Sequence, residues 1–573
     1  MRQLQGIPAS PGVVLGPAFR FERRSLEVPR LTGRDAAVEW ARFEAAAALA
    51  KDMLMRIRDR AEREVGKAQA DIFEAHLMFL EDPALLFAIR ESIESNGVNA
   101  EAAVYDATNY YAAILAELPD PTLSARAADV YDVGRRVLRI LMDVGEEDVT
   151  LTAPSIVIAH ELTPSDTVMM DRRLVLAMIT QIGGPTAHAA ILARSYGIPA
   201  IVGVGDGLLD IPAGVLVAVD GDSGTIIIDP DDETSQVYAI RQANLRSRLA
   251  HARAHTAEPA VSRDGRRVEV AANVGAASGA RAASDFGADG IGLFSTEFLY
   301  LKRESAPSED EQVEAYRAVI QVMGDRPVVV RTFDVGGDKP LPYMDIGRED
   351  NPFLGLRAVR IAFEQPDLLL TQLRAIYRAG AGRNVKIMFP MVATVSEARS
   401  LRGFARQACE DLRARNTPIA ERVEVGIMVE VPSAAVTADH LAREVDFFSI
   451  GTNDLAQYAL AADRTNARVA HIADAFHPAV LRLIKQVIDA SHTAGKWTGL
   501  CGELAGEPLA VPILFGLGLD EFSMNPPAVP VAKSIIRELT VAEARDIALR
   551  ALDQEDGAAV RALVRDKWPQ QMD

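Results

Sequence analysis

Cysteine is scarce in this sequence, which has only Cys409 and Cys501 among 573 residues. Two cysteines cannot form a disulfide framework, and such scarcity favours a reducing, cytoplasmic compartment. Positive charge is also in short supply, because 61 Lys and Arg residues face 80 Asp and Glu residues, for a net charge of −19. A nucleic-acid-binding protein needs a basic face, so we expect no nucleic acid as a partner.

Long apolar runs and a leader pattern are missing as well. Apolar stretches such as residues 215–228 are interrupted by Asp220 and Asp222 before they reach the length of a membrane-spanning helix. Residues 1–12 contain no basic stretch followed by an apolar run, which a secretory signal would require. We therefore expect no membrane insertion. The length of the chain predicts two to four globular domains.

Helical and β patterns divide the first half of the chain. From about residue 35 to 141, apolar residues recur at helical spacing, as in Ile72, Leu77 and Leu80. Short β-like runs follow at 155–159, 174–178, 200–204, 215–219 and 225–228. The pattern predicts an α/β domain made of residues 1–30 and 145–230, interrupted by a helical bundle at 31–144. A polar linker helix is expected within residues 231–260.

The remaining residues, 261–573, show a regular alternation of strand and helix. Eight short apolar runs each end in a polar group and are each followed by helical sequence. The runs are 268–273, 290–295, 328–332, 385–390, 423–430, 447–454, 498–503 and 521–525. Eight such units predict a (β/α)8 TIM barrel, whose functional residues lie at the carboxyl ends of its strands.

One of the nine histidines stands directly after a glycine turn. Residues 183–187, Gly-Gly-Pro-Thr-Ala, lead into His188 and then into a helical stretch, 189–194. We expect this position to be exposed at the positive end of a helix, where backbone N–H groups can hold a phosphate. The imidazole of His188 could act there as a nucleophile.

Charged side chains of both signs fall at the predicted strand ends of the barrel. Glu430 and Asp454 each close a predicted strand, and two carboxylates on one rim are suited to Mg²⁺. Arg331, Arg357 and Arg464 fall at the same rim. Guanidinium groups pair with phosphate and carboxylate, so the rim predicts a site for a small substrate that carries both.

These motifs carry a resemblance to a known family. Residues 183–190 resemble the phosphohistidine signature of the phosphoenolpyruvate (PEP)-utilising enzymes, and the whole chain has the segment order of the Enzyme I proteins of the sugar phosphotransferase system. The resemblance implies that His188, on a swivelling phosphohistidine domain, accepts a phosphoryl group from PEP and passes it to the histidine-containing phosphocarrier protein HPr. Residues 161–167 also match, and the resemblance implies that Thr167 hydrogen-bonds the imidazole. Alternatively, Thr167 only caps a helix that begins there.

The resemblance also implies roles for residues of the barrel and the helical insertion. It implies Arg331, Arg357, Asn453 and Arg464 as PEP ligands, Glu430 and Asp454 as Mg²⁺ ligands, and Cys501 as the donor of a proton to the enolate left by phosphoryl transfer. The barrel is expected to form a homodimer. Residues 72–83 resemble carrier-binding helices, which makes Met78, Glu81 and Asp82 the expected contacts to HPr, with His76 structural.

Two positions depart from the family pattern. Ala187 stands where the family usually has Ser or Thr before the histidine, and the second departure is in the barrel. In residues 290–298, Gly-Ile-Gly-Leu-Phe-Ser-Thr-Glu-Phe, the family has an arginine that contacts the substrate phosphate, and this chain has Ser295. Two hypotheses follow. Either the chain is a PEP-protein phosphotransferase that works without this contact, or it is a weakened Enzyme I-like regulator or phosphoacceptor with little PEP turnover.

Overall fold

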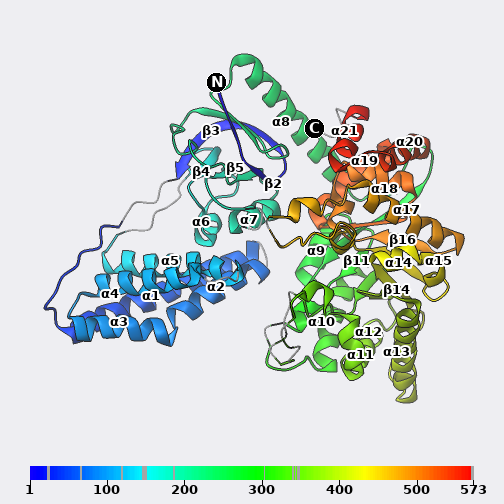
Figure 1. The fold of residues 1–573 in the computed structure, drawn as a ribbon, viewed down its shortest axis with the longest axis horizontal. Helices are drawn as coiled ribbons and strands as arrows, with labels where there is room; N and C mark the ends of the chain where they lie inside the picture. Colours follow the sequence, from blue (N-terminus) through cyan, green and yellow to red (C-terminus); the bar gives the residue numbers. More distant parts are fainter. Residues whose placement is uncertain are drawn as a thin grey trace. The chain divides into compact units, whose positions relative to one another are not determined.

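The computed structural model describes residues 1–21, 26–64, 67–117, 121–144, 151–184, 187–301, 303–337, 341, 343–344, 347, 349–466 and 468–568 (Figure 1). Side chains are described for these residues except 62–64, 67–71, 121–125, 188 and 195. The chain forms two compact units, Met1–Arg246 and Ser247–Asp573. The boundary falls inside α8, Asp232–Ala254, which is the helix predicted within residues 231–260.

The first unit is built on an eight-stranded mixed sheet of order β1-β8-β7-β3-β4-β5-β6-β2. Its strands are β1 Arg2–Gln5, β2 Ile7–Ser10, β3 Val13–Phe21, β4 Ser155–Ala159, β5 Val175–Thr180, β6 Ala200–Val202, β7 Leu216–Asp220 and β8 Thr225–Ile228. Strands β3 to β6 run parallel. Along β4, Val157 and Ile158 are buried in separate hydrophobic clusters, as a strand covered on both faces requires. The predicted β runs between 155 and 228 are thus confirmed.

A helical bundle interrupts this sheet between β3 and β4, as predicted. Its helices are α1 Ala36–Glu64, α2 Lys67–Leu80, α3 Pro83–Asn96, α4 Ala100–Ala116 and α5 Pro121–Leu141. Phe43, Phe73 and Leu77 are buried in its core, because apolar residues at helical spacing form one face of each helix. Two short helices lie in connections between strands of the sheet. They are α6 Pro164–Met169, between β4 and β5, and α7 His188–Tyr196, between β5 and β6.

The second unit is a closed barrel of eight parallel strands, which confirms the predicted (β/α)8 fold (Figure 1). The strands are β10 Arg267–Val274, β11 Ile291–Phe294, β12 Val328–Arg331, β13 Val385–Phe389, β14 Glu424–Val429, β15 Phe447–Ile450, β16 Trp497–Leu500 and β17 Glu521–Met524. Pairing of β10 with both β17 and β11 closes the barrel. A two-residue strand, β9 Ala260–Val261, adds to β10.

Helices surround the barrel and bury its outer face. They are α9 Ala277–Asp285, α10 Glu309–Met323, α11 Val359–Glu364, α12 Pro366–Ala379, α13 Val395–Ala414, α14 Pro432–Val436, α15 Ala438–Leu441, α16 Thr452–Ala459, α17 Pro478–Thr493, α18 Ala510–Leu517, α19 Val529–Glu538, α20 Val541–Leu552 and α21 Gly557–Lys567. Alternation along the strands sends Val328 and Val330 toward these helices, and Val329 into the interior with Met388.

One predicted strand ends earlier than expected. Strand β15 stops at Ile450, and α16 begins at Thr452, so Asn453 and Asp454 lie in the first turn of a helix rather than at the end of a strand. Their side chains still belong to the carboxyl-end face of the barrel, because α16 starts directly above β15. Among the described residues, no helix is both long enough and apolar enough to cross a bilayer.

Because α18 packs closely on α20, we expect one added methyl group at their contact to lower the stability of the barrel. A Cβ at Gly516 would collide with the backbone carbonyl of Ala544, whereas a Cβ at Gly403, on the exposed face of α13, would meet nothing. We expect Gly516→Ala to destabilise the barrel by about 1–3 kcal/mol through overpacking. Gly403→Ala, the matched control, should stabilise it by about 0.5–1 kcal/mol. Urea unfolding followed by circular dichroism measures both, and equal midpoints would contradict the close packing.

Candidate active site

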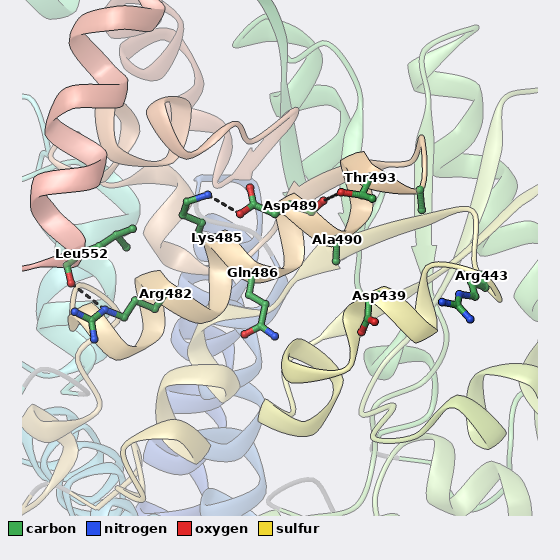
Figure 2. Close-up of a pocket in the computed structure, with 10 residues that line it drawn as sticks. Asp439, Arg443, Arg482, Lys485, Gln486, Asp489, Ala490, Thr493 and Leu552 are labelled. Carbon is green, nitrogen blue, oxygen red and sulfur yellow. Dashed lines mark hydrogen bonds and ion pairs between the residues drawn. The ribbon is translucent and has the colours of Figure 1, made fainter.

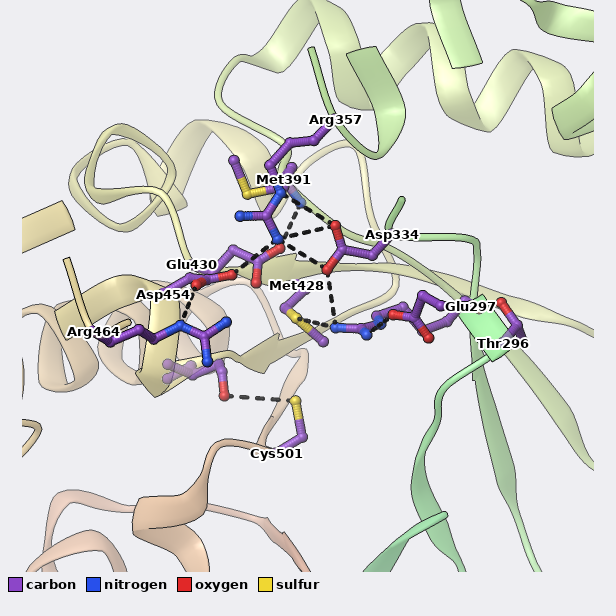
Figure 3. Close-up of polar contacts among 12 residues, drawn as sticks. Thr296, Glu297, Asp334, Arg357, Met391, Met428, Glu430, Asp454, Arg464 and Cys501 are labelled. Carbon is purple, nitrogen blue, oxygen red and sulfur yellow. Dashed lines mark hydrogen bonds and ion pairs between the residues drawn. The ribbon is translucent and has the colours of Figure 1, made fainter. Parts of the chain in front are cut away.

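Polar side chains from several strands and the segments that follow them converge at the carboxyl ends of the barrel strands (Figure 3). Arg331 is the last residue of β12, Glu430 follows β14 and Cys501 follows β16, while Asp454 comes from α16. Arg357 comes from the chain between β12 and α11. The structure therefore brings together the residues that the sequence placed at this rim.

Arg357 is the hub of this cluster, and its side chain is only 2% exposed. Its Nη2 lies 3.0 Å from each carboxylate oxygen of Asp334 and 3.2 Å from Oδ2 of Asp454. Its Nη1 donates to the hydroxyl of Tyr458 at 3.1 Å. Burial alone would lower the pKa of Arg357, but Asp334, Asp454 and Glu430 outweigh it and raise that pKa. The guanidinium thus stays charged and joins three segments of the barrel.

Arg331 is held from two sides by carboxylates. Its Nη2 hydrogen-bonds Oε1 of Glu297, and its Nη1 lies 3.5 Å from Oδ2 of Asp334. The Thr296 hydroxyl donates to the backbone carbonyl of Arg331 at 2.8 Å, which links the end of β12 to the loop after β11. The Arg331 guanidinium is therefore fixed in position by protein groups.

Arg464 and Asn453 complete the set of predicted substrate ligands. The Arg464 Nε lies 3.3 Å from Oδ1 of Asp454, and 38% of the Arg464 side chain is exposed. The guanidinium carbons of Arg464 and Arg357 lie 5.8 Å and 5.7 Å from the centre of the Phe353 ring. Asn453 Oδ1 accepts a hydrogen bond from the backbone N–H of Glu503 at 3.1 Å. The amide NH₂ of Asn453 is thereby oriented away from that backbone group.

Glu430 and Asp454 form the acidic pair. Glu430 is buried, and its Oε1 accepts the Met391 N–H at 2.6 Å. Burial, followed by the nearby charges of Asp454 and Asp334, raises the pKa of Glu430 to about 8. Among the described residues, Oδ1 of Asp454 accepts no hydrogen bond of good geometry, although the Nε of Arg464 lies 3.3 Å away. Two close carboxylates with an unsatisfied oxygen fit a hard divalent cation that keeps other positions for water or substrate.

Cys501 lies at the bottom of this cluster and is 4% exposed. Burial raises the pKa of its thiol to about 12, so the group is protonated at neutral pH. Its Sγ is 3.7 Å from the carbonyl oxygen of Ile450. A protonated thiol on the floor of a charged site can donate a proton to a substrate carbanion.

Ser295 directly follows β11, on the same rim. Its backbone N–H donates to the carbonyl of Val274 at 2.9 Å, and its side chain is half-buried. The neighbouring Glu297 binds Arg331, as described above. The position of the family arginine is thus occupied by a short neutral side chain beside a buried carboxylate.

In the first unit, His188 begins α7, which confirms that it follows the glycine turn at the start of a helix. Its side chain lies outside the described residues. Ala187 precedes it as N-cap and makes no side-chain cap. Thr167 does not cap α6, because Thr163 and Asp166 form the capping box. The Thr167 hydroxyl donates to the carbonyl of Pro164 at 2.9 Å, so the alternative reading of Thr167 as a cap is wrong.

The residues predicted to contact a carrier differ in their surroundings. Met78 on α2 is 73% exposed, and Glu81 is exposed and paired with Lys51. Asp82 caps α3, since its Oδ1 accepts the N–H of Ala84 at 2.8 Å, so at least part of its role is structural. The His76 ring is fully buried, with Nε2 3.2 Å from Asp129 Oδ1.

Sequence reasoning missed three groups that shape the barrel site. Asp334 and Tyr458 bind Arg357, and Glu297 binds Arg331. Glu297 and Asp334 were visible as acidic residues within three positions of a predicted strand end. Tyr458 gave no such signal, because it lies in the second turn of α16.

A separate surface cavity of about 800 Å³ lies among the helices outside the barrel (Figure 2). It is lined by residues of α15, α17 and α20, and none of the predicted site residues is among them. Its charges are partly satisfied within the protein, since Lys485 pairs with Asp489 at 2.5 Å and Arg482 donates to the carbonyl of Leu552 at 3.0 Å. We assign no role in the reaction to this cavity.

A parallel barrel with arginines and an acidic pair at its strand ends defines an enzyme of the (β/α)8 class with its site at the usual face. Three family matches agree with this, described as PEP-utilising enzyme N-terminal (residues 5–126), mobile (151–224) and PEP-binding (249–541) domains. The chain belongs to the PEP-utilising enzyme family.

Within that family the chain is similar to phosphoenolpyruvate-protein phosphotransferases. It is 45% identical to the one of Priestia megaterium over 95% of both chains. It is 43% identical to the one of Bacillus subtilis (strain 168), over 99% of this chain and 100% of the relative. An NMR solution structure of Enzyme I (nEIt) is 36% identical, covers 42% of this chain and 99% of its own, and superposes with a TM-score of 0.37.

The two arginines that contact Asp454 predict contrasting effects on stability. Arg357→Met leaves Asp334 and Asp454 buried without their shared cation, so we expect a loss of about 3–5 kcal/mol in the free energy of unfolding. Arg464→Met is the matched control, because Arg464 is partly exposed and makes one ion pair, and it should cost about 0–1 kcal/mol. Urea unfolding compares them. Equal losses would show that Arg357 is not the hub of the cluster.

Proposed function

We propose that the chain is a PEP-protein phosphotransferase, which transfers the phosphoryl group of PEP to His188 and then to the histidine of the carrier protein HPr. The observation that carries this proposal is the rim of the barrel, where three arginines and an acidic pair lie together in a chain of this family. The reaction is the first step of sugar uptake by a phosphotransferase system, and we place it in the cytoplasm, where PEP is formed.

The arginines would bind the two anionic ends of PEP. Arg331, Arg357 and Arg464 are each fixed by carboxylates, so their guanidinium groups need little further ordering when substrate binds. Phosphoryl transfer requires charge stabilisation on the phosphate oxygens more than covalent help from the protein. The amide of Asn453, held by the Glu503 N–H, is suited to donate to one of these oxygens.

Glu430 and Asp454 would hold Mg²⁺, which supplies positive charge to the phosphate oxygens when bound. The protein side of this site is already prepared, because Met391 orients Glu430 and Arg357 and Arg464 orient Asp454. Glu430 must lose its proton to act as a ligand. Its raised pKa therefore makes loading of the site weaker below about pH 8 than above it.

His188 would be the nucleophile. Its place at the start of α7 puts the backbone N–H groups of that helix near the phosphoryl group that the imidazole carries. For Thr167 to hydrogen-bond the imidazole, its hydroxyl would have to leave the carbonyl of Pro164. Cys501 would protonate C3 of the enolate of pyruvate, since its thiol is neutral and lies at the floor of the site.

The helical insertion would dock HPr. Met78 supports this, because a large apolar side chain that is mostly exposed is suited to a protein contact. Glu81 lies beside it and is exposed, whereas Asp82 contributes mainly by holding the start of α3. A homodimer through the barrel is the assembly we propose.

The function is tested by labelling with PEP that carries a labelled phosphoryl group. Wild-type protein with Mg²⁺ should take up acid-labile, base-stable label, and a chelator should prevent this. His188→Ala should abolish uptake, whereas His160→Ala, which removes an exposed histidine bound to Gln181 in the same unit, should retain it. Label that persists in His188→Ala would contradict the assignment of the nucleophile.

Because Ser295 stands where the family has an arginine, we expect restoring that arginine to increase the rate of phosphorylation. A charge-assisted contact that strengthens in the transition state is worth a few kcal/mol, so Ser295→Arg should speed phosphorylation of His188 by roughly 10² to 10³-fold. Ser295→Lys is the matched control, because it adds charge without a planar fork and should gain less.

Single-turnover labelling at saturating Mg²⁺ measures both variants. Rates for wild type and Ser295→Arg that agree within about threefold, less than the tenfold that ~1.4 kcal/mol represents, would show that another group already performs this role. If Ser295→Arg takes up label and the wild type does not, the wild-type chain is instead a weakened regulator or phosphoacceptor.

A further inference from the structure

A buried carboxyl group lies inside the barrel below the proposed site. Glu521 begins β17, and Gly499 of β16 and Ser449 of β15 are its successive neighbours across the sheet. The three residues therefore share one level of the barrel wall. Cys501 follows Gly499 by two positions, so it points to the same side one level higher.

Two glycines make room for the Glu521 side chain. A Cβ at Gly292 would come within 2.5 Å of Glu521 Oε1, and a Cβ at Gly499 within 3.0 Å. Glu521 is 4% exposed, and its Oε1 is buried without a hydrogen-bond partner. The carboxyl thus occupies interior space that larger residues would fill, and no hydrogen bond or ion pair among the described residues explains why it is there.

Among the described residues, Glu521 forms no ion pair, and most of the charged groups around it are acidic. Lys386 of β13 is engaged elsewhere, with its Nζ 2.6 Å from Glu424 and 4.1 Å from the centre of the Trp497 ring. Burial raises the pKa of Glu521 to about 8, and so do the charges of Glu269, Glu424 and Asp289, while Lys386 lowers it. Glu521 is therefore a neutral acid near neutral pH.

Polar groups connect this level to Cys501. The Ser449 hydroxyl is close enough to the Cys501 thiol to favour its thiolate, although it reaches no hydrogen-bond geometry with any group. On the other side, Ser523 Oγ donates to Asn273 Oδ1 at 2.6 Å, and Asn273 Nδ2 donates to the Cys501 carbonyl at 2.9 Å. The Ser449 hydroxyl is thus the polar group between the level of Glu521 and the Cys501 thiol, while Ser523 and Asn273 fix the Cys501 backbone.

We propose that Glu521 is the internal acid that returns a proton to Cys501 after each turnover. This inference rests on the proposed function. When Cys501 protonates C3 of the enolate, its S–H bond breaks and a C–H bond forms, which leaves a thiolate. The carboxyl proton of Glu521 passes by way of the Ser449 hydroxyl to the thiolate, and the Glu521 carboxylate regains a proton from water at the amino end of the barrel, where Glu269 is exposed.

Competing donors are less well placed. Cys501 is almost fully buried, so bulk water has little access to the thiolate. Glu430 also has a raised pKa, but as a Mg²⁺ ligand it must be deprotonated during turnover. The arginines at the rim hold their protons too tightly to give them up.

The test uses deuterated pyruvate with Mg²⁺ and the full chain, because exchange of its methyl deuterons into water requires proton transfer through Cys501 but no phosphoryl transfer. Glu521→Gln should slow this exchange by about tenfold or more, while single-turnover phosphorylation of His188 by PEP stays within about threefold. Glu521→Asp, which keeps an acid, should recover part of the exchange. Glu410→Gln, an exposed glutamate of α13, should match wild type.

Infrared titration of the carboxyl band gives a second measurement. A protonated-carboxyl band that is absent from Glu521→Gln should disappear from the wild type as pH rises through about 8. Equal exchange in wild type and Glu521→Gln would overturn the relay while leaving the phosphotransferase intact. Wild-type protein that neither exchanges pyruvate nor labels His188 would instead overturn the proposed function.

Discussion

The buried guanidinium of Arg357 is the constraint on which the barrel site depends. It holds Asp334 and Asp454 at hydrogen-bond distance, and these carboxylates in turn fix Arg331 and Arg464. Ion pairs in such a position are costly to bury unless their geometry is good and further hydrogen bonds satisfy the charged groups. The positions of these three guanidinium groups are therefore set by the protein itself.

With all of its carboxyl groups ionised, this network would carry more negative than positive charge. Its carboxylates are Glu297, Asp334, Glu430 and Asp454, and its guanidinium groups are Arg331, Arg357 and Arg464. Burial and then this surplus explain why Glu430 holds a proton more tightly than an exposed glutamate, and a divalent cation would offset the surplus when Glu430 ionises. The neutral Ser295 leaves this surplus uncompensated, because an arginine there would bring the two signs into balance.

The sequence predicted the barrel and most of its rim, because strand-helix alternation and polar groups at strand ends are local patterns. It misplaced Asn453 and Asp454 on a strand, since a strand end and a helix start look alike when only Gly451 separates them. The partners of the arginines could not be predicted, because contacts such as Arg357 with Tyr458 join residues a hundred positions apart. Similarly, nothing in the sequence marks Glu521 as a buried carboxyl, because the two glycines that make room for it lie on other strands.

The parallel pairing of β3 with β4 has a consequence for how the first unit folds. These neighbouring strands are separated in sequence by residues 22–154, so closing the sheet means closing a long loop. The entropy cost of such a loop grows slowly with length, but it must be met before the pairing is formed. The helices of the insertion make mostly local contacts and can form early. Once formed, they shorten the effective distance between the strand ends, so the bundle acts as a folding scaffold for the sheet that it interrupts.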